Sequence, residues 1–178
     1  MKFTENRPLA CAILAVVILG VLFIGGGNAL GAKSKAVETT FFAASESISA
    51  ELKELSDNAV VMNSIAANAK GVNETLVKAV NDAVEALRGA ETIAAKADAS
   101  HDLIAAVENL YSNVSNLKLS DKDAEDFKYR YRNFESALLR ISHDGYNDEA
   151  AAFNSEKAGF PAGLISAVRG IRDAVAFN

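Results

Sequence analysis

The hydrophobic positions of the chain follow two patterns, which are one unbroken apolar run near the N-terminus and then stripes at helical spacing. No charged residue lies between Arg7 and Lys33, and the segment from Leu9 to Gly25 is almost entirely apolar. A bilayer core about 30 Å thick needs roughly 20 apolar residues of helix to cross it. We therefore predict a transmembrane anchor in residues 9–27, with membrane lipid as its partner.

A cleaved signal peptide is the competing interpretation of this run. Such peptides have a shorter apolar region and a cleavage site of small residues. The run is longer than that, but the small residues in 25–32 leave cleavage open. A lipoprotein at Cys11 is excluded, because almost nothing apolar precedes that cysteine.

The flanking charges do not decide on which side of the membrane the rest of the chain lies. Lys2 and Arg7 precede the run, and Lys33 and Lys35 follow it. Since Lys and Arg near the ends of a spanning helix set its orientation, this balance is a tie.

Beyond the anchor, apolar residues recur every three or four positions, as on one face of a helix. After a hinge or helix break expected at the glycines of 25–31, we predict a helix over 33–70, with a stop at Gly71. A second helix is predicted from the cap Asn73 to about 98–100, and a third from Ser100 or Asp102. The first and last stripes are Phe41, Ala44, Ile48, Leu52, Leu55, Ala59 and Met62, and Phe127, Tyr131, Phe134, Leu138 and Ile141.

The last stripe belongs to a fourth helix, which is predicted to begin at Ser120 and to continue to Phe153. The segment 160–178 is predicted to be an amphipathic helix with Leu164, Ile165, Val168, Ile171 and Val175 on one face. We expect it to pack on the helices before it, with membrane contact and partner docking as alternatives. The expected organisation is therefore an anchor in 1–32, a helical bundle in 33–159 and a C-terminal segment in 160–178.

Composition agrees with an all-α protein that has one domain after the anchor. The chain has 178 residues, of which 50% are hydrophobic and 23% charged, and its only cysteine lies in the apolar run. The net charge of −5 gives no basic surface for nucleic acid, so we expect no nucleic-acid partner.

Candidate catalytic and metal-binding residues are lacking. His101 and His143 lie far apart and have no metal-binding spacing. The acidic run 121–126 lacks the glycine and the closing glutamate of a calcium loop, and it suits the start of a helix instead. We therefore expect no enzyme activity, no cofactor and no metal.

The C-terminal part of the sequence resembles the closing motif of the LemA family. The matching residues, in order, are Tyr146-Asn147, Phe153-Asn154 and Phe160-Pro161-Ala162-Gly163-Leu164-Ile165, with Phe177 as the final aromatic. Residues 103–111 are similar to the short third helix of the family. Residues 52–60 depart from it, because the basic pair is reduced to Lys53 and the proline is absent.

This resemblance implies a single-pass membrane protein with an antiparallel four-helix bundle of long helices. The function we expect is a non-enzymatic interaction or scaffold module that binds an unidentified protein, with self-association left open. A sensory bundle that binds a small ligand and signals through a partner is the alternative. The candidate interaction residues are Tyr146, Asn147, Phe153, Phe160, Pro161, Leu164 and Ile165.

Overall fold

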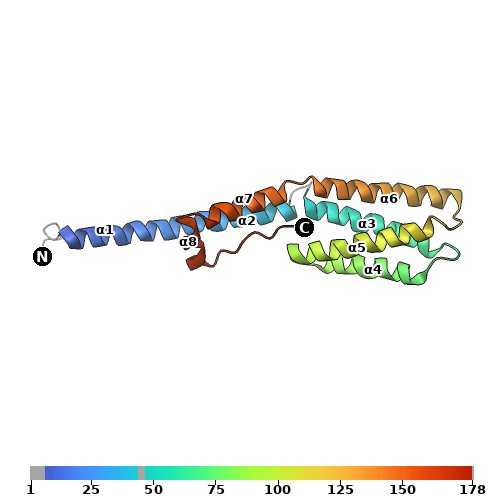
Figure 1. The fold of residues 1–178 in the computed structure, drawn as a ribbon, viewed down its shortest axis with the longest axis horizontal. Coiled ribbons are helices and arrows are strands. Elements are labelled where there is room, and N and C mark those ends of the chain that lie inside the picture. Colours follow the sequence, from blue (N-terminus) through green and yellow to red (C-terminus); the bar gives the residue numbers. More distant parts are fainter. Residues whose placement is uncertain (1–6, 44–46, 178) are drawn as a thin grey trace. The chain divides into compact units, whose positions relative to one another are not determined.

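A computed structural model describes residues 7–43 and 47–177, and this part of the chain is helical, with no strand (Figure 1). The all-α prediction is therefore confirmed. The helices are α1 (Arg7–Val21), α2 (Gly27–Ala43), α3 (Ile48–Ala67), α4 (Glu74–Gly89), α5 (Ile93–Val114), α6 (Asp121–Ser142), α7 (Tyr146–Ala158) and α8 (Ala162–Arg169), with a π-helical turn, η2 (Leu22–Gly26), between α1 and α2.

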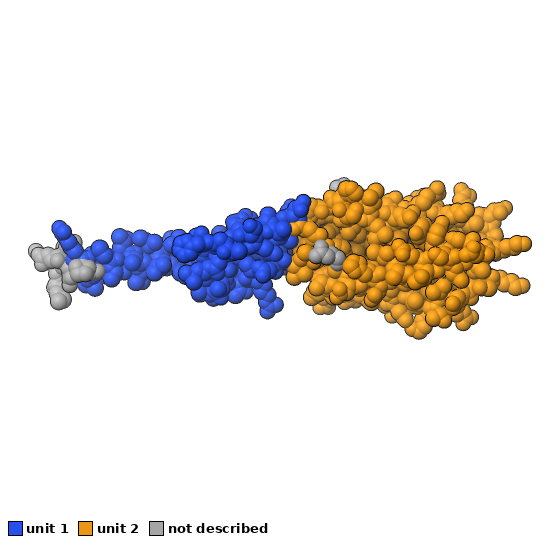
Figure 2. Space-filling view, in the orientation of Figure 1, with its two compact units in different colours: residues 1–38, 148–174 blue, residues 39–147, 175–178 orange. Residues whose placement is uncertain are grey.

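The chain forms two compact units (Figure 2). Unit 1 contains residues 1–38 and 148–174, and unit 2 contains residues 39–147 and 175–178. These boundaries differ from those expected at 32 and 159, because α2 and α7 each pass from one unit into the other.

The N-terminal helix is long and apolar enough to cross a membrane, by length and composition. It extends from Leu9 to Phe42, and its most apolar window has a mean hydropathy of 2.8 and no buried residue. A signal sequence would pass the same test. Of the hinge or helix break predicted at the glycines of 25–31, the break was wrong, since η2 and α2 carry the helix through them.

Short polar side chains at helix starts explain several boundaries in unit 2. The predicted caps are confirmed, because the side chain of Asn73 accepts a hydrogen bond from the backbone N–H of Thr75, and that of Ser120 from Asp123. Ser47 and Thr92 cap α3 and α5 in the same way, and these two caps were not predicted. The helices predicted over 33–70 and from Asn73 to about 98–100 are therefore both interrupted, and α5 begins at Ile93.

Three further boundaries involve glycines or the end of α6. Gly71 has the expected positive φ, of 92°, but α3 already ends at Ala67 with Asn68 as its C-cap, before the predicted stop. α6 ends at Ser142 rather than continuing to Phe153. The predicted C-terminal helix ends at Arg169, because Gly170 takes a φ of 66°, and residues 171–177 have no regular secondary structure.

The core of unit 2 is centred on α3, which packs against α4, α5 and α6, while α4 also packs against α5. The first predicted stripe is buried at Phe41 of α2 and at its five positions on α3, and Ala44 lies outside the described residues. On α6 the prediction is confirmed for Phe127 and Phe134, whereas Tyr131, Leu138 and Ile141 are only half-buried. The largest fully buried side chains of unit 2 are Phe41, Ile48, Leu52, Leu55, Met62, Val80, Leu103, Val107, Leu110, Val114 and Phe134.

The core predicts that two leucine-to-alanine substitutions in unit 2 differ greatly in their effect on the free energy of unfolding. Leu103 is 0% exposed, and Leu139 is 61% exposed. We expect Leu103→Ala to lower the free energy of unfolding by about 2–5 kcal/mol, because it leaves a cavity. Leu139→Ala is the matched control and should stay within about 0.5 kcal/mol of the unchanged chain. Urea unfolding of the detergent-solubilised full chain measures both, and equal losses would contradict this core.

Candidate functional site

In unit 2, the predicted residues Tyr146 and Asn147 bind the end of the chain. The Asn147 side chain donates to the carbonyl of Phe177 at 2.7 Å and accepts from the N–H of Phe177 at 2.8 Å. The Tyr146 hydroxyl donates to the carbonyl of Val175 at 2.7 Å. Phe41 packs beside the rings of Tyr146 and Phe177, with centroid distances of 5.2 and 5.5 Å. These residues therefore fix the C-terminus to unit 2.

In unit 1, Asn154 repeats the double hydrogen bond seven residues later in α7. Its side chain donates to the carbonyl of Ala174 at 2.9 Å and accepts from the N–H of Ala174 at 2.8 Å. The Lys157 ammonium donates to the carbonyl of Ile171 and lies 2.5 Å from a carboxylate oxygen of Asp173. Phe153, which is another of the candidate interaction residues, is buried.

The other predicted residues lie around α8 in unit 1, and they do not share one environment. Ile165 is buried, whereas Phe160, Pro161 and Leu164 are exposed. The peptide bond between Phe160 and Pro161 is cis. The expected packing of this face was therefore wrong for Leu164 and Val168, which are exposed, and right for Ile165, which is buried.

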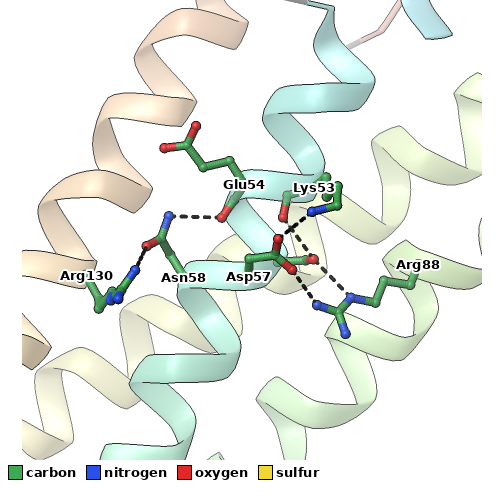
Figure 3. Close-up of polar contacts among 7 residues, drawn as sticks. Lys53, Glu54, Asp57, Asn58, Arg88 and Arg130 are labelled. Carbon is green, nitrogen blue, oxygen red and sulfur yellow. Dashed lines mark hydrogen bonds and ion pairs between the residues drawn. The ribbon is translucent and has the colours of Figure 1, made fainter. Parts of the chain in front are cut away.

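A second polar cluster lies along α3 in unit 2, and we call it the α3 polar face (Figure 3). Asp57 lies at its centre, with its two carboxylate oxygens 2.8 Å from the Lys53 ammonium and 2.7 Å from the Arg88 guanidinium. Arg88 also donates to the hydroxyl of Ser56 at 3.1 Å. Hydrogen bonding to Lys53, and then the charges of Lys53 and Arg88, hold the pKa of Asp57 below its ordinary value.

The α3 polar face continues toward α6. The Asn58 amide donates to the carbonyl of Glu54 at 3.0 Å and accepts from Arg130 at 3.5 Å (Figure 3). Arg140 pairs with Glu51 and Glu54, each at 2.7 Å, which raises the pKa of the guanidinium. The ion pairs of Arg140 join α6 to α3, and they leave Arg140 and Glu54 partly in contact with water, whereas the Glu51 side chain is only 13% exposed.

Two hollows flank the α3 polar face. The first, of about 380 Å³, has Leu52 and Leu87 among its lining residues and is bordered by Lys53, Arg88 and Lys96. The second, of about 330 Å³, lies between α3 and α6 beside Asn58 and Arg130. The first hollow combines an apolar floor with an excess of cationic side chains, which is suited to contact with an acidic partner.

The histidines do not form a metal site in the part of the chain that the structure describes. In residues 7–43 and 47–177, no group of three or more His, Cys, Asp or Glu side chains is placed to hold a metal ion. His143 lies 2.8 Å from the carbonyl of Leu139 at the end of α6, and His101 borders a third hollow of unit 2.

Comparison with known proteins gives no relative. No protein-family model, no curated protein and no solved structure matches the chain.

In the sequence, the residues of the α3 polar face stand out only as a departure from a family pattern. A local signal was present, because Lys53 and Asp57 stand four residues apart and so lie on the same face of a helix. Arg88 could not be found in this way, since it comes from α4 and pairs with Asp57 only after folding.

The asparagine contacts predict which backbone amides of the C-terminal segment are protected from exchange. We expect Asn147→Ala to speed exchange of the Phe177 amide, and Asn154→Ala that of the Ala174 amide. The change should be about two- to tenfold, as the loss of a net hydrogen bond of about 0.5–1.5 kcal/mol implies.

Hydrogen exchange of the full chain, read by mass spectrometry on C-terminal peptides, measures the effect. Asn68→Ala is the control, because Asn68 makes only a local hydrogen bond to Ser64. Unchanged exchange at both amides in the two test variants would show that these pairs do not hold the segment.

Proposed function

We propose that the chain is a non-enzymatic, single-pass membrane protein of the LemA type, whose unit 2 binds a partner protein. The apolar helix that begins at Leu9 supports the anchor. The order of Tyr146-Asn147, Phe153-Asn154 and Phe160-Pro161 supports the family.

We also propose that α3–α6 form an antiparallel four-helix bundle. α3 packs against the other three helices. The connections over 68–73, 90–92 and 115–120 are short, and short connections join helices that run in opposite directions. A bundle held by its own core leaves its polar surface available for a partner.

The observation that carries the partner-binding proposal is the α3 polar face with its first hollow. Lys53, Arg88 and Lys96 border an apolar floor, and among the described residues Asp57 supplies the only carboxylate in the lining of that hollow. The Lys53 side chain is 77% exposed although it pairs with Asp57, so it can contact a partner at the same time. We infer that the partner presents acidic side chains to this surface.

A photo-crosslinking residue at Ser49, which borders the first hollow, tests the proposal in native membranes. We expect an adduct with a second protein, and we expect Lys53→Glu to reduce it several-fold because the charge toward an acidic partner is reversed. Crosslinked products are quantified by immunoblot against the chain.

Lys78→Glu is the matched control for Lys53→Glu. Lys78 pairs with Asp82 four residues later, as Lys53 pairs with Asp57, and its side chain is 74% exposed. It lies on α4 and does not line the first hollow. If both variants retain the adduct equally, or if Ser49 gives no adduct, the α3 polar face is not the docking surface.

A small-ligand site is the second candidate function, and one hollow of unit 2 favours it. This hollow, of about 220 Å³, is bordered by Leu55, Ile104 and Leu138 and by the polar residues His101 and Asn147. Small-molecule sites combine an apolar lining with a few polar groups in this way, usually in pockets of about 300–1,000 Å³. The hollow therefore suits a ligand of few atoms.

Thermal unfolding of the full chain with a panel of small metabolites distinguishes this candidate. A ligand that binds the folded state raises the unfolding temperature. We expect His101→Ala to abolish such a shift and His143→Ala to retain it, because His143 does not border the hollow. The ligand-binding function is excluded if no compound shifts the transition or if both variants behave alike.

A further inference from the structure

The exposed large apolar side chains of unit 1 fall into two groups. One group lies on α1 and η2, between Leu9 and Ile24, and belongs to the proposed anchor. The other group consists of Phe160, Leu164 and Val168, which are 92%, 53% and 67% exposed. Leu164 and Val168 stand four residues apart in α8 and so lie on one face of it, and Phe160 lies in the turn just before the helix.

α8 packs directly on the N-terminal helix within unit 1. A Cβ atom added to Gly26 would lie 2.9 Å from Cδ1 of Ile165, and one added to Gly27 would lie 2.6 Å from Nε of Arg169. Arg169 also donates a hydrogen bond to the side chain of Asn28 at 2.5 Å. Because these two glycines have no side chain, α8 can pack closely against the backbone of the N-terminal helix.

The contact lies at the end of the apolar run. From Leu9 to Gly25 the helix rises about 25 Å, at about 1.5 Å per residue, and the hydrocarbon core is about 30 Å thick. No charged residue occurs between Arg7 and Lys33, and Lys33 forms an ion pair with Glu156 of α7. A helix that touches Gly26 and Gly27 therefore lies where hydrocarbon gives way to lipid headgroups, provided that the anchor spans the membrane.

We propose that Phe160 and α8 form a second membrane-contact surface, with Phe160, Leu164 and Val168 in the acyl-chain boundary of the bilayer. This inference rests on the proposed transmembrane anchor. The flanking charges suit this position, because Arg169 and the exposed Arg172 can reach lipid phosphates while the apolar face stays in hydrocarbon.

Lipid is favoured over a protein as the occupant of this face because the face is continuous with the anchor. Ile165 and Pro161 border the same hollow, of about 280 Å³, as Leu22 and Leu30 of the N-terminal helix. Any bilayer that surrounds Leu22 therefore reaches the vicinity of α8.

Site-directed spin labelling of the full chain in phospholipid nanodiscs tests the proposal. The only cysteine is removed by Cys11→Ser, and nitroxides are attached singly through Phe160→Cys, Val168→Cys, Ile18→Cys and Ala151→Cys. Ile18 lies exposed on α1 in the anchor, and Ala151 lies exposed on α7. Power saturation compares accessibility to oxygen, which concentrates in lipid, with accessibility to a water-soluble nickel chelate.

We expect the oxygen-to-nickel accessibility ratio at Phe160 and Val168 to be several-fold higher than at Ala151 and to approach that at Ile18. A ratio at both positions equal to that at Ala151, with Ile18 in lipid, overturns this inference but leaves the anchor intact. Low access to both reagents at Phe160 and Val168 also overturns it, because a protein then covers the face. A water-exposed Ile18 refutes the anchor and, with it, this proposal.

A pair of glycine variants tests whether the contact at η2 holds α8 at this depth. In the spin-labelled Val168→Cys variant, we expect Gly26→Val to lower the oxygen-to-nickel accessibility ratio, because the added side chain collides with Ile165 and displaces α8. Gly25→Val is the matched control, since a Cβ at Gly25 has no neighbour within 4 Å. Equal ratios in the two variants would contradict the role of the glycine contact.

Discussion

The close approach of α8 to the N-terminal helix depends on two positions that have no side chain. At Gly26 and Gly27 the helix surface is bare backbone, and Ile165 and Arg169 occupy the space that a Cβ would need. The rest of unit 1 follows from this contact. α8 is held beside η2, the exposed Phe160 and Val168 are carried toward the end of the apolar run, and the chain then turns back at Gly170.

The all-helical fold and much of the unit 2 core could be predicted from the sequence, because residues such as Leu52 and Phe134 stand at helical spacing among polar neighbours. The helix breaks at Ser47 and Thr92 were harder to find. A cap differs from an ordinary helical Ser or Thr only in its backbone conformation, which the apolar stripe does not reveal. Glycines gave the opposite error, since Gly26 and Gly27 stay helical where a break was expected.

Part of the candidate site could not be predicted for a different reason. Asp57 and Lys53 are neighbours on one helix, but Arg88 reaches Asp57 from α4, and Arg140 reaches Glu51 from α6. Such pairs arise from the packing of helices that are distant in sequence. The buried residues Leu30 and Val37 of α2 were missed because a stripe cannot be recognised where nearly every neighbour is small or apolar.

The C-terminal segment is recognised through its peptide groups. Asn147 and Asn154 each bind one residue by both its N–H and its carbonyl, as a neighbouring strand would. None of these four hydrogen bonds uses a side chain of the segment. The identity of most side chains between Ile171 and Phe177 is therefore free to drift during evolution, whereas the count of residues between the two paired positions is fixed. An inserted or deleted residue there would put one asparagine out of register. Proline at either paired position would remove the backbone N–H that donates a hydrogen bond to the asparagine side chain.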